Sequence, residues 1–394
     1  MKSPAESLTL PQALTRTFQA FFESEKSGGI LLVLCTACSL VLANSAFGAG
    51  YLAFWQTVAF GLSVEHWIND ACMAIFFLLI GLELERELYS GELSSFRNAL
   101  LPVVAALGGV LMPALIHFAL NAGTSTQAGF GIPMATDIAF AIGALALLGR
   151  RVPASLKVFV VAFAVIDDLL AILVIAALYT AKIHADYLAG AAAVFLLLGA
   201  LNRFGRVMAL TPYLLGGVVM WYLMYKSGVH ATIAGVLLAF AIPFSARDDD
   251  SHSPSHRLEM MLHKPVAFLI LPLFALANTA IVAGAGWQQN LLSANSLGIG
   301  AGLVLGKPLG ITLFCFVAVA LGISRLPGTL RWHHVWGAGL LGGIGFTMSI
   351  FIANLAFAGQ ADLVNTSKMV VLLGSLTAGL LGLAWLALWG DARN

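Results

Sequence analysis

Two adjacent aspartates lie near the middle of a long apolar stretch, and their type and spacing suit the binding of a proton or a hard cation. Residues 158–178 read VFVVAFAVIDDLLAILVIAAL, with Asp167 and Asp168 as the only polar side chains. A stretch of this length crosses a bilayer as one helix. A carboxylate at the centre of such a helix costs at least about 2.5 kcal/mol, and two neighbours repel each other. The pair therefore requires a polar cavity, a cation or a proton to compensate it.

Three more polar side chains occur where the chain is otherwise apolar, and they complement the aspartate pair. Asp137 follows Thr136 in the run GIPMATDIAFAIGALALLG, and Lys307 lies in the middle of GIGAGLVLGKPLGITLF. A lysine deep in a membrane is as costly as an aspartate, and an acidic partner is its natural compensation. We therefore expect the segments that carry these residues to face one cavity.

Two of the segments that must position these residues are not expected to be regular helices. Pro133, shortly before Asp137, removes a backbone donor and disfavours helix at the preceding residue. The run GAGLLGGIGFTMSIF, residues 337–351, holds too many glycines for an uninterrupted helix. Close packing alone accounts for many glycine-rich membrane helices. Breaks at corresponding positions of two repeats are instead typical of a transporter site at the midplane.

Interrupted helices bring partial charges of about ±0.5 to the membrane midplane. Asp137 is suited to offset exposed N-terminal helix ends, and Lys307 to offset exposed C-terminal ends. For Asp137, the sequence supports this structural role and direct binding of a cation equally.

The composition sets the class of protein. The chain of 394 residues is 60% hydrophobic and only 10% charged, whereas globular proteins carry about 25% charged residues. We therefore predict an all-α polytopic membrane protein with twelve transmembrane helices, in which helices 4 and 11 are the interrupted ones. The predicted segments are 29–46, 66–88, 99–120, 128–148, 155–180, 186–202, 210–225, 229–243, 262–284, 297–320, 335–357 and 367–389.

The distribution of Lys and Arg predicts the orientation of these helices. Sixteen basic residues fall on the side of the N-terminus and three on the other, so both termini are expected in the cytoplasm. Residues 1–28 lack the apolar core of a secretory signal and predict a short surface helix that ends at Gly28-Gly29. Residues 29–394 are expected to form one transmembrane domain. Its longest polar stretch, residues 245–264, predicts a solvated loop rather than a metal site.

An acidic cluster ends the second predicted segment, in the sequence GLELERE. Glu83 and Glu87 are one helical turn apart, and Arg86 lies between them on nearly the same face. A solvated helix end and an acidic funnel that attracts cations both fit these residues.

Several long motifs resemble those of one family of membrane proteins. The runs PMATDIAFAIGALALLG, FAVIDDLLAILVIAALYT, KSGVHATIAGV, GKPLGI and GGIGFTMSIFIANLAF are similar to those of the NhaA family of sodium/proton antiporters. The similarity extends from about Gly28 to the last predicted helix. This family is itself a known example of inverted repeats with broken helices. The resemblance therefore implies inverted-topology repeats formed by helices 3–5 and 10–12, with helices 4 and 11 crossing.

The resemblance also implies roles for the buried residues. Asp167 and Asp168 would bind Na⁺, with Thr136 nearby; Lys307 would pair with Asp167; and Asp137 would lie at the helix crossing. The core would comprise helices at about 99–180 and 297–389, and a panel of helices at about 29–88 and 186–284 would form the interface.

Further implications concern the cytoplasmic side and the assembly. The resemblance favours a pH-sensing funnel of Glu83, Arg86 and Glu87, joined by Glu259 and His263. Met260 stands where the family often has a histidine, so the pH threshold is not carried over. The family further implies a bacterial inner-membrane location and a homodimer built partly through the segment before the second helix.

The implied activity follows from the chemistry of a buried carboxylate. Desolvation favours its protonated form, and Na⁺ or Li⁺ is a hard cation that prefers the same oxygens. Proton and cation would then compete for Asp168 and Asp167, and a site that opens alternately to each side would exchange them. Transfer of a proton from Lys307 would make the exchange electrogenic. The expected partners are Na⁺, Li⁺, H⁺ and membrane lipid, with no cofactor and no nucleic acid.

Two other functions, one of the same broad class and one of another, fit part of this pattern. A sodium-coupled symporter of similar fold requires a roomier polar cavity for an organic substrate, and few other polar residues are predicted at the midplane. An intramembrane aspartyl protease requires two aspartates on different helices. Asp137 and Asp168 meet that condition, but neither lies in a Gly-x-Gly-Asp context.

Overall fold

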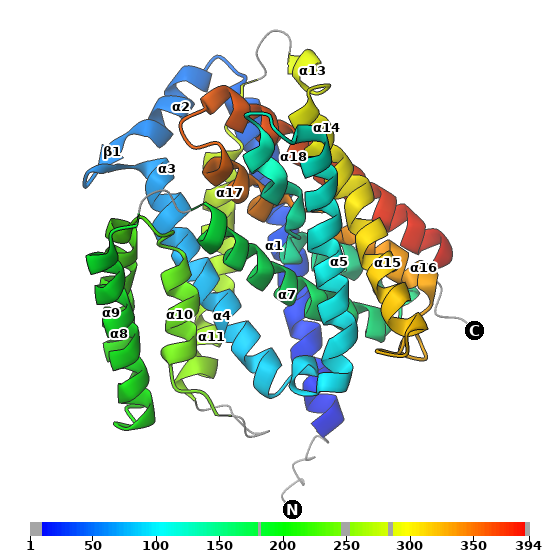
Figure 1. Ribbon diagram of the computed structural model, residues 1–394, viewed down its shortest axis with the longest axis horizontal. Helices are drawn as coiled ribbons and strands as arrows, with labels where there is room; N and C mark the ends of the chain where they lie inside the picture. The colour runs from blue at the N-terminus through cyan, green and yellow to red at the C-terminus, as the bar shows by residue number, and fades with distance from the viewer. Residues whose placement is uncertain (1–9, 180–182, 246–252, 283–286, 391–394) are drawn as a thin grey trace, which may run out of the picture.

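The computed structural model describes residues 10–179, 183–245, 253–282 and 287–390, and these form an almost wholly helical protein (Figure 1). Within these ranges one two-stranded antiparallel hairpin pairs β1 (Val58–Ala59) with β2 (Leu62–Ser63), with Val58 opposite Ser63. The helices are α1 (Leu10–Ala43), α2 (Gly48–Gln56), α3 (Val64–Trp67), η1 (Ile68–Cys72), α4 (Met73–Tyr89), η2 (Glu92–Ser94), α5 (Phe96–Asn121), η3 (Gln127–Met134), α6 (Ile138–Leu148), η4 (Gly149–Arg151), α7 (Ala154–Leu178), α8 (Ala185–Arg203), α9 (Leu210–Ser227), α10 (Ile233–Ala241), α11 (Pro254–Pro265), η5 (Val266–Ile270), α12 (Leu271–Asn278), α13 (Trp287–Asn290), α14 (Ala294–Ala301), η6 (Gly302–Gly306), α15 (Lys307–Ala320), α16 (Trp332–Gly342), α17 (Phe346–Ala356) and α18 (Ala361–Trp389).

The predicted class, an all-α polytopic membrane protein, is confirmed. Among the described residues, eight helices are long and apolar enough to cross a membrane, or up to ten if each of two bent pairs is one span. Other helices are too short to span alone; α10 has nine residues, against about 20 for a full crossing. The count of twelve helices and the inverted repeats therefore stay predictions.

The expected end of the first helix at Gly28-Gly29 is wrong. Helix α1 runs without interruption through both glycines. A Cβ on Gly28 would contact Ala267, and one on Gly29 would contact the backbone of Ala139. Small residues allow membrane helices to approach closely, so these glycines allow α1 to pack against its neighbours rather than ending it.

The polar stretch 245–264 is only partly a loop. Residues 246–252 lie outside the described residues, but α11 begins at Pro254. The Oγ of Ser253 accepts a hydrogen bond from the backbone N–H of His256, and a proline in the first turn is compatible with helix. The cap and the proline start the helix earlier than hydropathy alone predicts.

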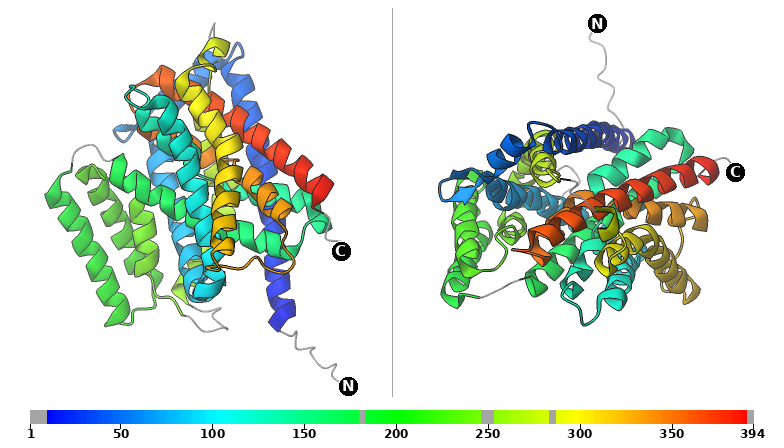
Figure 2. Two further views of the ribbon diagram at one scale, coloured as in Figure 1. Left: turned by 45° about the vertical axis from the view of Figure 1, so that its right-hand side comes forward. Right: turned by 90° about the horizontal axis from the view of Figure 1, so that it is seen from above.

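The helices fall into two groups that differ in position (Figure 2). Helices α8, α9 and α10 pack together at one side and reach the rest of the protein through α4, while α5 is surrounded by α7, α14, α15 and η3. The approach of α5 to α15 is very close, because a Cβ on Gly108 would meet the carbonyl oxygen of Gly310. Helix α1 packs against both α6 and α12.

Both expected irregular segments are interrupted. The 3₁₀ helix η3, which contains Pro133, is followed by three non-helical residues before α6 starts at Ile138. Helices α16 and α17 are separated by residues 343–345 and bend by 48°. The backbone N–H of Asp137 donates to the carbonyl oxygen of Ile344 at 2.6 Å. The two breaks are thus in direct contact.

Candidate functional site

The charges of Lys307 and Asp167 form an ion pair in the protein interior. Lys307 is the first residue of α15, and Asp167 lies near the middle of the continuous helix α7. Nζ of Lys307 lies 2.8 Å from Oδ2 of Asp167, and both side chains are 0% exposed. A buried charge that loses its partner is strongly destabilising, so each residue depends on the other for its burial.

Thr136 connects this ion pair to the second broken helix. Its hydroxyl oxygen accepts a hydrogen bond from Lys307 Nζ at 2.9 Å and donates to the carbonyl oxygen of Gly342 at 2.8 Å. Gly342 is the last residue of α16, and the carbonyl groups at a helix C-terminus carry partial negative charge. The ammonium of Lys307 therefore lies close to the negative end of α16.

Asp137 lies between the N-terminal ends of α6 and α17. Its Oδ1 accepts from the backbone N–H of Phe140 in the first turn of α6. Its Oδ2 accepts from both the backbone N–H and the hydroxyl of Thr347, the second residue of α17. A carboxylate is favoured at a helix N-terminus, where unpaired N–H groups and the helix dipole are positive. One side chain thus compensates two helix ends inside the protein.

Asp168 differs from Asp167 because it borders an open space. The side chain is 1% exposed, and it lines a cavity of about 40 Å³ with Asp137, Thr347, Glu83 and His263. A cavity of this size holds water or a small ion. Among the residues that the structure describes, Oδ1 of Asp168 has no hydrogen-bond partner. Asp168 therefore offers a cation an unused buried oxygen.

The cavity extends toward the end of α4 that carries Glu83. His263 Nδ1 lies 3.9 Å from Glu83 Oε1, so α4 and α11 meet at the cavity wall. Beside them, Arg86 Nη1 lies 2.6 Å from Glu259 Oε1. Glu87, one turn beyond Glu83, is partly buried and also interacts electrostatically with Arg86.

The structure places the predicted site residues in three sets. Glu83, His263, Asp137 and Asp168 line the cavity. Asp167, Thr136 and Lys307 form a second set in the interior, outside the cavity lining. Arg86, Glu87 and Glu259 form a third set beside Glu83, at what we call the cavity mouth. Met260, which follows Glu259 in α11, is exposed.

Sequence reasoning missed two side chains that belong to this region. Thr347 supplies two donors to Asp137, and the only signal in the sequence was a hydroxyl two residues after the last glycine of the run 337–351. Glu85 is buried and accepts a hydrogen bond from Ser255 of α11 at 3.1 Å. Nothing in GLELERE distinguishes Glu85 from Glu83 and Glu87, which are only partly buried, because the packing of α11 decides which glutamate is fully covered.

This geometry determines what the site can do chemically. The cavity gives access to the Asp168 carboxylate from one end of the protein, and the low dielectric around it favours neutralisation by a proton or a cation. Asp167 can exchange its present partner, an ammonium, for another positive charge. The cavity is too small for a large organic molecule, since its volume is only about 40 Å³.

Comparisons with known proteins cover nearly the whole chain. A family model described as Na⁺/H⁺ antiporter 1 matches residues 19–386. A Na(+)/H(+) antiporter NhaA of Dechloromonas aromatica (strain RCB) is 66% identical over 381 residues, 97% of this chain and 98% of that protein. The corresponding protein of Cytophaga hutchinsonii is 57% identical over 373 residues, 95% of both chains. That of Vibrio campbellii is 49% identical over 364 residues, 92% of this chain and 93% of its own.

Proposed function

The chain belongs to the Na⁺/H⁺ antiporter 1 family, and from that premise we propose that it extrudes Na⁺ in exchange for protons by alternating access. It is a multi-pass membrane protein and a secondary transporter, not an enzyme. Family membership removes the intramembrane protease as a candidate. The small cavity beside Asp168 favours an ion over the organic cargo of a symporter.

The observation that carries the proposed mechanism is the position of Asp168. Its carboxylate lines the cavity and has an oxygen without a hydrogen-bond partner among the described residues. A hard cation prefers carboxylate and other oxygen ligands, and a proton neutralises the same group. Occupancy of Asp168 by Na⁺ and by H⁺ is therefore mutually exclusive, which is the requirement for exchange.

Asp167 and Lys307 extend this competition to a second proton. In the present state the ammonium of Lys307 neutralises Asp167 at 2.8 Å. When Na⁺ is shared between Asp168 and Asp167, with Thr136 nearby, Lys307 loses its counter-charge. A lysine buried without a counter-charge favours its neutral form and releases a proton. Two protons would then move for each Na⁺, and the exchange would be electrogenic.

Alternating access requires two groups of helices that move relative to each other. The core comprises helices at about 99–180 and 297–389, including the two inverted repeats with interrupted helices at their centres. The panel comprises helices at about 29–88 and 186–284. Helix α1 packs against α12 of the panel and α6 of the core, so relative motion of the groups takes place along α1.

The residues at the cavity mouth have a separate role, in attracting cations and in regulation by pH. Glu83 and His263 line the cavity, and the Arg86–Glu259 ion pair lies next to them on α4 and α11. Protonation of the carboxylates or of the histidine changes the charge at the mouth, and hence the local concentration of cations.

The proposed setting is the inner membrane of a bacterium, where the proton gradient supplies the energy for pH homeostasis and salt tolerance. Both termini and the cavity mouth are on the cytoplasmic side in this proposal. Li⁺ is a second cargo, since its oxygen chemistry is that of Na⁺. The hairpin of β1 and β2 and its exposed Phe60 are the proposed contact of a homodimer embedded in lipid.

Everted membrane vesicles provide the deciding experiment. Addition of Na⁺ to respiring vesicles is expected to collapse part of the pH gradient, and Asp168→Asn is expected to abolish this response. A response that persists in Asp168→Asn would overturn the role of Asp168. A wild-type protein without any Na⁺ response between about pH 6.5 and pH 9, the range in which buried carboxylates and histidines titrate, would overturn the function.

A further inference from the structure

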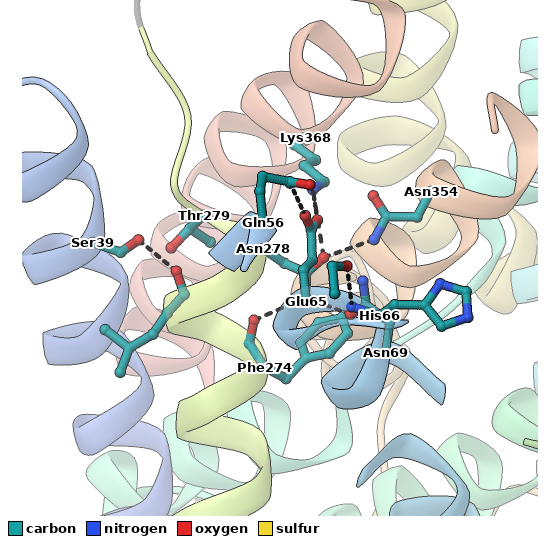
Figure 3. A network of polar contacts seen from close by, with 12 residues as sticks. Ser39, Gln56, Glu65, His66, Asn69, Phe274, Asn278, Thr279, Asn354 and Lys368 are labelled. Atoms are coloured by element: carbon teal, nitrogen blue, oxygen red, sulfur yellow. Dashed lines mark hydrogen bonds and ion pairs between the residues drawn. The ribbon is translucent and has the colours of Figure 1, made fainter. Parts of the chain in front are cut away.

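A second buried lysine takes no part in the proposed exchange, and it contacts other residues than Lys307 does. Lys368 belongs to the first part of α18 and is only 5% exposed. Its Nζ lies 3.4 Å from Oδ1 of Asn278 in α12 and 3.8 Å from Oε1 of Glu65 in α3 (Figure 3). A buried ammonium is costly without such partners. These contacts are therefore the compensation for its burial.

Asn278 is the centre of a polar network around this lysine. Its side chain is 0% exposed. Its Nδ2 donates to Oδ1 of Asn69 at 2.7 Å, and its Oδ1 accepts from Nδ2 of Asn354 at 2.7 Å (Figure 3). We call Glu65, Asn69, Asn278, Asn354 and Lys368 together the Lys368 clasp. A buried network with its partners in place is rigid, and removal of one member leaves the others unsatisfied.

The clasp joins the two groups of helices that the proposed mechanism sets in motion. Lys368 and Asn354 belong to α18 and α17 of the core. Their partners Glu65 and Asn278 belong to α3 and α12 of the panel, as does Asn69 of η1. Each hydrogen bond or ion pair between these two sets therefore crosses the proposed boundary between moving parts.

The clasp lies at the opposite end of the protein from the cavity mouth. Glu65 and Glu83 belong to one continuous helical span, Val64–Tyr89. They are eighteen positions apart in the sequence, which corresponds to about 27 Å along a helix axis. The cavity joins Asp168 to the end that carries Glu83. The Glu65 end holds the clasp instead.

Helix α17 links the ion site to the clasp through three positions on one face. Thr347 bonds Asp137, Phe351 follows one turn later, and Asn354 bonds Asn278. Residues at i, i+4 and i+7 lie on the same side of a helix. The ring of Phe351 is 1% exposed and packs against Phe77, Phe274 and His230, with ring centres 5.8, 6.5 and 5.4 Å away. An aromatic layer therefore separates the cavity from the clasp.

We propose that the Lys368–Glu65 pair, held by Asn278, is the latch that keeps the access route at the Glu65 end closed while the Glu83 end is open. This proposal rests on the proposed function. When core and panel separate at this end, the contacts of Lys368 with Glu65 and Asn278 break and water replaces them. Loss of Glu65 alone destabilises the closed arrangement, because the ammonium of Lys368 is then buried without a counter-charge. It costs little in the open arrangement, because water hydrates the ammonium there. Such a loss therefore shifts the population toward opening at the Glu65 end.

The test is the apparent KM for Na⁺ measured separately at the two faces, with everted and right-side-out vesicles. An apparent affinity is scaled by the fraction of protein in the binding-competent state. The ratio of the KM at the Glu83 face to the KM at the Glu65 face therefore follows the equilibrium between the two states. For Glu65→Gln we expect this ratio to rise by about tenfold. A general loss of folded protein lowers the maximal rate but leaves the ratio unchanged.

Charge rescue and a matched control complete the design. The double variant Glu65→Gln/Lys368→Met removes the stranded ammonium, and its ratio is expected to return to within about twofold of wild type. The matched control is Asp70→Asn. Asp70 lies close to Glu65 in the sequence but pairs with His66 and not with Lys368, so this variant is expected to leave the ratio unchanged.

The outcomes separate the latch from the function on which it rests. A ratio unchanged in Glu65→Gln, or a double variant that stays as shifted as the single one, overturns the latch. If Glu65→Gln does not accumulate in the membrane, Asn354→Ala provides the same measurement with a smaller rise, because it removes one donor without stranding a charge. Wild-type vesicles that show no Na⁺ response overturn the proposed function itself.

Discussion

Nζ of Lys307 lies 2.8 Å from Oδ2 of Asp167, and neither side chain is exposed to solvent. This contact joins α15 to α7, 140 residues apart in the chain. The ammonium of Lys307 also donates to the hydroxyl of Thr136, which in turn donates to the carbonyl oxygen of Gly342 at the end of α16. One lysine thus contributes to both the proposed ion site and the packing of a broken helix, so its loss is expected to affect stability as well as transport.

Lys307→Ala is predicted to destabilise the protein by about 3–5 kcal/mol, because it leaves the Asp167 carboxylate buried without a partner. The measurement is the thermal unfolding midpoint of the purified protein in detergent. Asp167→Asn/Lys307→Met removes both charges and is expected to recover most of the loss. A midpoint unchanged in Lys307→Ala would contradict the dependence of one residue on the other.

Asp137→Ala is predicted to lower stability by about 1 kcal/mol for each of the two helix ends that it caps. Asp137→Asn retains one side-chain oxygen and is expected to lie between Ala and wild type. Thr347→Val is the control, because it removes one hydroxyl donor and leaves both backbone N–H groups paired with Asp137. Thermal midpoints should follow the order wild type, Asp137→Asn, Asp137→Ala. Equal midpoints for all three would argue against the double cap.

Acidification is predicted to raise the apparent KM for Na⁺ at the cavity mouth. A ligand carboxylate must lose its proton before it binds the cation, so affinity falls by up to about tenfold for each pH unit below the range where Asp168 titrates. The KM rises as the pH falls because protons compete with Na⁺ for the same carboxylate. Initial rates in everted vesicles at several Na⁺ concentrations and pH values provide the measurement. A pH effect on the maximal rate alone, at constant KM, would count against a shared site.

Glu83→Gln is predicted to raise the apparent KM for Na⁺ about two- to fivefold at low ionic strength, since it removes negative charge from the cavity mouth. The difference from wild type is expected to fade in high concentrations of choline chloride, which screens exposed charges. Asp186→Asn, at an exposed position of α8, is the matched control and should leave KM unchanged. An effect of Glu83→Gln that is independent of salt would indicate local structure rather than attraction of cations.

Much of the fold and of the site could be read from residue type and local pattern. Apolar segments and the low share of charge predicted a helical membrane protein, because a bilayer excludes unpaired polar groups. Pro133 and the glycines of residues 337–351 predicted the two breaks, since both residue types disfavour helix locally. The cost of a charge in the membrane singled out Asp137, Asp167, Asp168 and Lys307 for the same reason.

Other features could not be read from local pattern, because distant segments create them. Gly28 and Gly29 are within a helix, since α1 packs closely against residues from two other segments. Lys368 is one of the three basic residues counted on the side opposite the N-terminus, and that count does not reveal that α3 and α12 bury its side chain. Local composition does not record which neighbours surround a side chain.

The sequence by itself determined which residues were too costly to stand alone in a membrane, because that cost depends only on residue type and on the apolar run around it. The tertiary structure decided how each cost is met. Asp167 is paired with an ammonium, Asp137 compensates two helix ends, and Asp168 is left beside a cavity. The adjacent aspartates differ in role because successive residues of a helix point about 100° apart, and only packing determines what each direction contains.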